Sequence, residues 1–85
     1  MPAPAIVTLL TRPGCHLCDD ARVVVTAVVA QNPHAILVER SIEDDPVLVE
    51  QYAEEIPVVL INDRVHNIWR VDAERLLSAL NKETS

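Results

Sequence analysis

Residues 12–21 read RPGCHLCDDA, and this stretch contains both cysteines of the 85-residue chain. The two cysteines, Cys15 and Cys18, are separated by His16 and Leu17, with a Pro-Gly pair before them and two aspartates after them. Pro-Gly is typical of a turn, and acidic residues are favoured in the first turn of a helix, where they face the positive end of the helix dipole. We therefore interpret the stretch as a turn that leads into a helix, with the cysteine pair at the helix start.

The segments on either side of the cysteine pair predict a strand and a helix. Residues 5–11, AIVTLLT, form a short run of apolar and β-branched residues that ends before the Pro-Gly turn, which is typical of a buried strand. From Cys15 to about Asn32, apolar residues recur at spacings of three and four, as in a helix with one buried face. The run Val23-Val24-Val25 favours a strand by propensity, but the segment is too long for an ordinary strand and begins with acidic residues. We therefore expect a helix here.

Further along, the chain predicts a second strand and a second helix. Strand-like sequence begins at residues 35–38 and is expected to continue toward Ile42. Asp44-Asp45 then supplies an N-cap candidate, and Pro46 suits the first helical position because its missing N–H has no partner there in any case. A helix is expected to follow through Ala53.

The last third of the chain predicts a hairpin and a final helix. Ile56-Pro57 opens the apolar run VVLI, and Asn62-Asp63-Arg64 separates this run from VHNIWRV at residues 65–71. Two such runs joined by a short polar turn predict a hairpin. Asp72 is a good N-cap for a last helix, and residues 81–85 are expected to fray from its end. The buried side of this helix is expected to consist of Leu76, Leu77 and Leu80.

The predicted order of elements is β-α-β-α-β-β-α, which indicates an α/β fold. The first two strands, joined by a helical crossover, are expected to be parallel, and the hairpin adds two more strands. We expect a four-stranded mixed sheet with helices on both faces. The chain is too short for a second hydrophobic core, so residues 1–85 are expected to form a single domain.

Composition and charge limit the kinds of partner. The net charge is -6, and no run of Lys or Arg interrupts this balance, so nucleic acids and anionic membranes are not expected partners. The N-terminal segment has too short an apolar run for a spanning helix and lacks the pattern of a secretory signal. We therefore expect a cytoplasmic protein, and we expect a monomer.

Cytoplasmic thiols that lie close together more often bind a metal or carry redox chemistry than form a structural disulfide. At a helix start, Cys15 meets unpaired N–H groups and the positive end of the dipole, which favour a thiolate and predict a nucleophile. Cys18 lies one turn deeper and is expected to be the resolving thiol that attacks a mixed disulfide. Arg12 and His16 add positive character near the pair, whereas the two aspartates oppose it.

Together, the strand, the Arg-Pro-Gly turn, Cys-His-Leu-Cys, the helix and the later Ile56-Pro57 resemble the thioredoxin fold in its short glutaredoxin-like form. The resemblance covers nearly the whole chain and implies a thiol-disulfide oxidoreductase that reduces protein or glutathione mixed disulfides through Cys15 and Cys18. It also implies that the Ile56–Pro57 bond is cis, that Pro57 packs against the Cys15 sulfur, and that the backbone of Ile56 is free to bind an extended substrate or glutathione. Arg12 matches a position where glutaredoxins carry a lysine for a glutathione carboxylate.

The chain departs from glutaredoxins at three places around the expected site. His16-Leu17 replaces the usual Pro-Tyr between the cysteines, and Glu54-Glu55 precedes the proline where a basic residue is common. Val71 and Asp72 stand where Gly-Gly normally precedes the last helix, and Asp72 is the one match for a residue that accepts the γ-glutamyl amine. No bound cofactor is expected, and either glutathione as co-substrate or a thioredoxin-type protein is the expected reductant.

Two other interpretations of the cysteine pair stay open from the sequence. In the first, the chain is a non-catalytic binding module or metal carrier that uses Cys15, Cys18 and His16, with His34 or His66 as a further ligand. In the second, the thiols are simply small buried side chains. Aromatic residues offer no rival site, because Tyr52 and Trp69 have no cluster of basic residues around them and are interpreted as packing residues.

Overall fold

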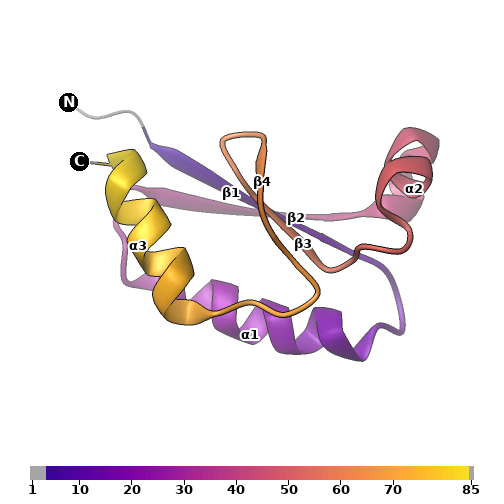
Figure 1. The fold of residues 1–85 in the computed structure, drawn as a ribbon, viewed down its shortest axis with the longest axis horizontal. Helices are drawn as coiled ribbons and strands as arrows, with labels where there is room; N and C mark the ends of the chain where they lie inside the picture. The colour runs from indigo at the N-terminus through magenta and orange to yellow at the C-terminus, as the bar shows by residue number, and fades with distance from the viewer. Residues whose placement is uncertain (1–3, 85) are drawn as a thin grey trace.

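A computed structural model describes residues 4–84, which form four strands and three α-helices (Figure 1). In chain order the elements are β1 Ala5–Thr11, α1 His16–Ala30, β2 Ala35–Ser41, the short 3₁₀ turn η1 Ile42–Asp44, α2 Pro46–Tyr52, β3 Val58–Ile61, β4 Arg64–Ile68 and α3 Ala73–Thr84. This order confirms the predicted β-α-β-α-β-β-α arrangement.

The strands form one mixed sheet in the order β2-β1-β3-β4. β1 and β2 are parallel, with Ala5 opposite Ala35, because helix α1 carries the chain back to the starting edge. β1 and β3 are antiparallel, with Leu10 opposite Val58, and β4 pairs with β3 in the hairpin. The C-terminal end of β1 therefore lies beside the start of β3, which places the cysteine turn next to residues 56–57.

One face of the sheet is covered by α1 and α3, which lie on the same side of it in Figure 1. Strand residues that alternate along β1 and β3 point to this side and pack against the apolar stripes of the two helices. Ala5, Val7, Leu9, Ala21, Val25, Val28, Val59, Ile61, Leu76 and Leu80 make up this buried cluster. The leucines predicted for the inner side of the last helix are thus in place, with Leu77 packed at the cluster's edge.

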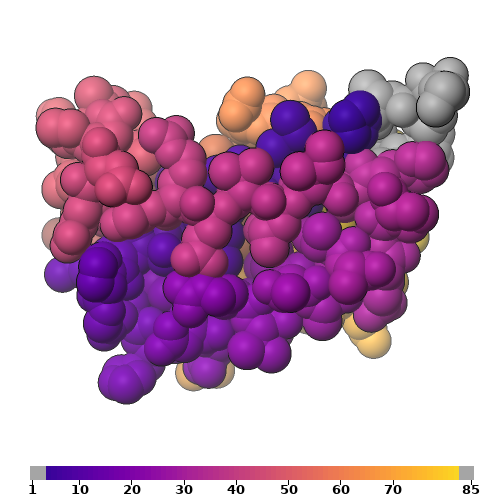
Figure 2. All heavy atoms as spheres, turned by 180° about the vertical axis from the view of Figure 1, so that it is seen from behind, coloured from indigo at the N-terminus to yellow at the C-terminus, as the bar shows by residue number. Residues whose placement is uncertain are grey.

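The other face is covered only at one end, by α2. Leu10, Ile42 and Val58 are buried there under Leu48 and Tyr52, which confirms that Tyr52 is a packing residue. The rest of this face is a hollow of about 320 Å³ between α2 and the β3–β4 turn, seen as a notch in the upper outline of Figure 2. Helices therefore pack on both faces, as predicted, but very unequally.

Helix α1 forms in spite of its β-branched run because the packing of one face outweighs intrinsic propensity. Val25 is fully buried, Val24 is half-buried, and Val23 faces solvent, so the three valines occupy three sides of a helix. At α2, the Asp45 side chain accepts a hydrogen bond from the Val47 N–H at 2.9 Å, and Pro46 occupies the first helical position. Both features agree with the predicted cap.

Both predicted ends of β4 and the predicted end of the last helix are wrong. Strand β4 begins at Arg64 and ends at Ile68, so it does not reach residue 71, because Trp69 adopts a φ of 66° that no strand accommodates. The hairpin turn is instead the pair Asn62 and Asp63, whose φ values of 49° and 67° suit the tight turns that follow strand twist. The last helix continues to Thr84, although the sequence predicted fraying from residue 81.

Within residues 4–84, none of the helices combines the length and the apolar content that a membrane span requires.

Candidate functional site

Cys15 is the N-cap residue of α1. Its backbone is extended, with φ -94° and ψ 113°, and its sulfur accepts a hydrogen bond from the Cys18 N–H at 3.2 Å. The sulfur thus takes the place that a Ser, Thr or Asp oxygen has at most helix starts, and it satisfies one of the N–H groups that a helix leaves unpaired. Cys15 is partly exposed, whereas most core residues around α1 are closed to solvent.

Cys18 lies in the first turn of α1 and is fully buried. The pKa of its thiol is raised to about 11, first of all by burial and then by the hydrogen bond with the Cys15 side chain and the Cys15 charge, while the Arg12 backbone N–H and the Arg22 charge act in the opposite direction. At neutral pH the Cys18 thiol is therefore protonated. The two cysteines are both free thiols and differ sharply in access: one faces solvent and the other lies beneath it.

The Ile56–Pro57 peptide bond, which is cis, lies at the start of β3 beside this turn. Pro57 is fully buried, and its carbonyl oxygen accepts a hydrogen bond from the Trp69 N–H at 2.8 Å. The Ile56 N–H donates to the Tyr52 carbonyl oxygen at 3.2 Å. The expectation that the Ile56 backbone is free for a substrate is therefore wrong for its N–H group.

Arg12 and His16 flank the cysteine turn, and both side chains are exposed. Arg12 leaves β1 just before the turn, and His16 is the first residue of α1. The structure thus places both residues next to the cysteine turn in the chain, with their side chains open to solvent.

Val71 and Asp72 connect β4 to α3. An Asp72 carboxylate oxygen accepts hydrogen bonds from the N–H groups of Glu74 at 2.9 Å and Arg75 at 3.2 Å, which confirms its predicted role as a helix cap. Val71 is half-buried against the cluster under α1 and α3. The carboxylate of Asp72 remains exposed to solvent, as a second role in ligand binding requires.

A groove of about 290 Å³ runs between α1 and the segment that follows β4. Its lining residues are Leu17, Asp20, Ala21, Val24, Trp69, Arg70 and Val71. Trp69 is 54% exposed, and its indole N–H donates to the Glu54 carbonyl oxygen at 3.1 Å. The interpretation of Trp69 as a packing residue missed this place in the groove wall, although its position two residues before Val71 was a signal.

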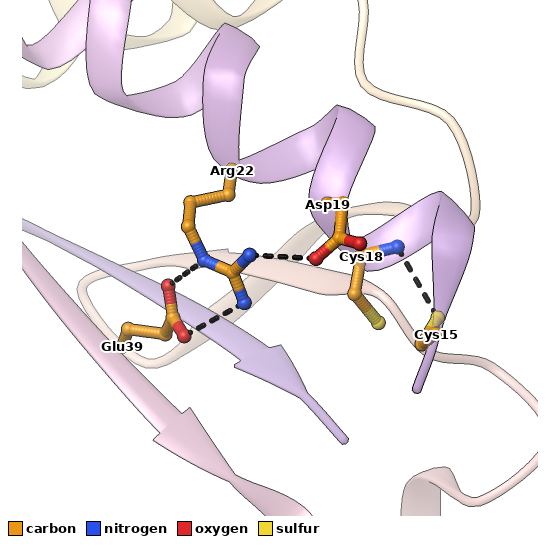
Figure 3. A network of polar contacts seen from close by, with 5 residues as sticks. All are labelled: Cys15, Cys18, Asp19, Arg22 and Glu39. Atoms are coloured by element: carbon orange, nitrogen blue, oxygen red, sulfur yellow. Dashed lines mark hydrogen bonds and ion pairs between the residues drawn. The ribbon is translucent and has the colours of Figure 1, made fainter. Parts of the chain in front are cut away.

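A second feature that the sequence did not predict lies one turn beyond Cys18. The guanidinium of Arg22 donates to both carboxylate oxygens of Glu39, at 2.6 and 3.0 Å, and to Asp19 at 2.8 Å (Figure 3). These contacts, with Glu39 first, raise the pKa of Arg22 above its ordinary value. The Asp19–Arg22 spacing is visible in the sequence, but the Glu39 contact depends on how α1 crosses β2.

The metal-site alternative requires several ligands in one place. Among residues 4–84, the structure brings no three His, Cys, Asp or Glu side chains together in a group that could hold a metal ion. His34 and His66, the further ligands considered for Cys15, Cys18 and His16, therefore do not complete such a group.

Comparison with known proteins gives one family and a set of similar folds. The model of the glutaredoxin-like domain (DUF836) matches residues 6–81. A protein of X. campestris is 30% identical, with a TM-score of 0.66 over 89% of this chain and 96% of that chain. A Nitrosomonas europaea protein solved by NMR is 20% identical, with a TM-score of 0.77 over 94% of this chain and 95% of that one.

A mutant thioredoxin from Halobacterium salinarum NRC-1 is 14% identical and has a TM-score of 0.73, over 98% of this chain and 77% of that chain. At that level of identity the likeness concerns the fold alone. No protein with a curated description matches the chain.

Proposed function

The chain belongs to the family of glutaredoxin-like domains (DUF836), and from this membership and the geometry of the cysteine pair we propose that it is a thiol-disulfide oxidoreductase. Cys15 is the nucleophile and Cys18 is the resolving thiol. The substrates are disulfide-containing proteins or small mixed disulfides in the cytoplasm, and the protein acts as a single-domain monomer without a bound cofactor.

One observation supports this proposal above all others. Cys15 is partly exposed at the N-terminus of α1, and its sulfur is hydrogen-bonded to the backbone N–H of Cys18, whose side chain is buried. Backbone N–H groups at a helix start stabilise negative charge. A substrate disulfide can therefore reach one sulfur and not the other, which is the asymmetry that an ordered two-step exchange needs.

The reaction follows from this asymmetry. The Cys15 thiolate attacks one sulfur of the substrate disulfide, and the other sulfur leaves with the bonding electrons and takes a proton. The Cys18 thiol then loses its proton and attacks the Cys15 sulfur, which forms the Cys15–Cys18 disulfide and releases the second substrate sulfur as a thiol. The substrate gains two electrons and two protons, the protein is oxidised by the same amount, and two equivalents of a thiol reductant return it to the dithiol.

The residues around the pair supply the substrate contacts. The carbonyl oxygen of Ile56, next to Pro57, accepts a hydrogen bond from an extended substrate, since the Ile56 N–H is already engaged. Arg12 and His16 attract the carboxylates of a substrate that approaches Cys15. Val71 and Asp72 border the far side, where the exposed carboxylate of Asp72 is available to a substrate amine.

The reductant is proposed to be either glutathione or a thioredoxin-type protein. Glu54 is exposed ahead of Pro57 and repels the carboxylates of glutathione, which favours the protein reductant. Oxidised protein mixed with glutathione alone, or with a thioredoxin system, separates the two, because only the natural reductant regenerates both thiols at a useful rate.

The test of the function itself compares wild type with Cys15→Ser and Cys18→Ser. Mild oxidation of wild type is expected to remove two hydrogens from the intact mass, and Cys15→Ser is expected to lose at least about a thousandfold in disulfide reduction, as expected when a nucleophile is removed. Cys18→Ser is expected to accumulate a mixed disulfide on Cys15. A wild-type chain that forms no Cys15–Cys18 disulfide would contradict the proposal.

A further inference from the structure

Arg22 lies four residues after Cys18 on α1, so the two side chains share one face of the helix. Figure 3 shows the guanidinium between Asp19 and Glu39 on the side of the helix where the Cys18 sulfur points. Three hydrogen bonds of 2.6, 2.8 and 3.0 Å hold it there. Because Arg22 donates two of them to Glu39 on β2, the cation is fixed to the sheet as well as to its own helix.

The Cys18 sulfur is buried and must become negatively charged before it attacks, so a nearby cation would stabilise it. The residue is fully buried, and burial by itself opposes this negative charge. The groups that act on it are Cys15 from the turn, the backbone N–H of Arg12 from the end of β1, and the charge of Arg22 from α1. The carboxylates of Asp19 and Glu39 lie beyond Arg22 and are paired with it.

We propose that Arg22 is a positioning residue for the resolving step of the thiol-disulfide cycle: its guanidinium, held by Glu39 and Asp19, stabilises the negative charge that develops on the Cys18 sulfur. This inference rests on the proposed oxidoreductase function. When Cys15 is tied up in a mixed disulfide, its sulfur is neutral and no longer affects Cys18 as a charge. Arg22 then remains as the side-chain charge that acts on the attacking sulfur.

The network also fixes the sign of the effect. In Arg22→Gln the cation is lost, and two carboxylates that it had neutralised remain near Cys18. Both changes disfavour the Cys18 thiolate and raise its pKa. A thiolate fraction that is about tenfold smaller slows the attack only about threefold, because a more basic thiolate is also a better nucleophile.

The experiment uses the full chain and one reagent, dithiobis(nitrobenzoic acid). The reduced protein is expected to release nitrothiobenzoate in two phases: the first as Cys15 forms a mixed disulfide, and the second as Cys18 displaces the remaining aryl thiol. Arg22→Gln is expected to slow the second phase about threefold at neutral pH, with little change in the first. Arg22→Lys keeps the charge and is expected to restore most of the rate.

The matched control is Glu39→Gln, which removes one carboxylate charge but leaves the guanidinium hydrogen-bonded to Asp19 and to the amide oxygen at position 39. Because the cation stays in place, the second phase is expected to be as fast as in wild type or faster. The pH profile adds a readout that a loosened fold would not give: at pH values where Cys18 is ionised in both proteins, the second phase of Arg22→Gln is expected to be as fast as in wild type or faster, because the more basic thiolate is the better nucleophile.

Three outcomes would overturn the assignment of Arg22: an unchanged second phase in Arg22→Gln, no rescue by Arg22→Lys, or equal slowing in Glu39→Gln. The proposed function fails in a different way, through the absence of any second phase in wild type. Unfolding curves for each variant exclude a simple loss of the folded state.

Discussion

The two faces of the sheet are built very differently. Under α1 and α3, Val7, Leu9 and Leu76 are buried to within a few per cent. On the opposite face, Ile6 and Ile36 remain 44% and 50% exposed, because α2 reaches only the end of the sheet near η1. Most of the apolar area that stabilises the fold is therefore buried on one side.

This difference explains where the site lies. Helix α1 covers the well-packed face, and its first turn follows directly from the loop at the C-terminal end of β1. Cys18 belongs to the buried side of that turn, and Cys15 belongs to the solvent side. The core thus fixes the helix that presents the reactive sulfur, and the sulfur itself contributes little to the core.

Among the variants that test the difference between the two faces of the sheet, Leu76→Ala is expected to change the free energy of unfolding the most. The Leu76 side chain on α3 is fully buried in the cluster under α1 and α3. Its truncation is therefore expected to lower the free energy of unfolding by about 2–5 kcal/mol. Urea denaturation measures this loss. The reactivity of Cys15 in the folded fraction is expected to stay unchanged, because Leu76 does not line the cysteine turn.

Val23→Ala is the matched control on α1. Val23 is 72% exposed, and alanine is the better helix former, so the free energy of unfolding is expected to stay the same or rise slightly. Similar losses at Leu76 and Val23 would contradict the claim that stability comes mainly from the side chains buried under α1 and α3.

A second effect concerns the buried thiol and appears at alkaline pH. The Cys18 pKa is about 11 in the folded chain, against 9.0 for an unperturbed thiol. Between these values the unfolded chain has released the proton and the folded chain has kept it, so stability falls as the pH rises through this window. The loss is expected to be about 2 kcal/mol on going from about pH 8 to about pH 10.5.

Urea unfolding of the reduced protein at the two pH values measures this loss. Cys18→Ala is the reference, since it lacks the titrating thiol and keeps all other ionisable groups. The stability of wild type is expected to drop more steeply than that of Cys18→Ala. If the stability of the two proteins depends on pH in the same way, burial does not disfavour the Cys18 thiolate in the folded chain.

Much of this fold was predictable because its signals are local. The Pro-Gly turn, the acidic first turn and the spacing of apolar residues identify α1, and packing at Val25 confirms the helix against β-branched propensity. Asp45 and Asp72 cap their helices as predicted because capping involves residues two or three positions apart. The position of Cys15 at the helix start follows from the same local pattern.

The parts that could not be predicted depend on contacts between distant segments. Arg22 and Glu39 are 17 residues apart, and their contact requires both the crossing of α1 over the sheet and the register of β2. Trp69 leaves β4 with a positive φ because its backbone and indole N–H groups bind Pro57 and Glu54. Periodicity carries no information on such bonds, so the groove beside α1 was missed.

The smallest expected effect comes from the open face. Ile36 on edge strand β2 lies opposite Ile6 on β1 and is half-exposed, so Ile36→Thr keeps the β-branched shape and loses only part of a cross-strand contact. The free energy of unfolding is expected to fall by about 0.5 kcal/mol. The adjacent Leu37→Thr is the internal control, since Leu37 points to the opposite face and packs against the cluster under α1 and α3.

Leu37→Thr is expected to cost more than Ile36→Thr, by about 1 kcal/mol or more, because it also places a hydroxyl against apolar neighbours. Ile36 and Leu37 are adjacent residues of the same edge strand. The difference between their losses in the free energy of unfolding therefore reports which face of the sheet each side chain occupies. Urea unfolding at two protein concentrations completes the test. If Ile36→Thr lowers the free energy of unfolding as much as Leu37→Thr does, the sheet face that carries Ile36 is covered in solution. If the loss caused by Ile36→Thr also grows with protein concentration, a second copy of the chain covers that face.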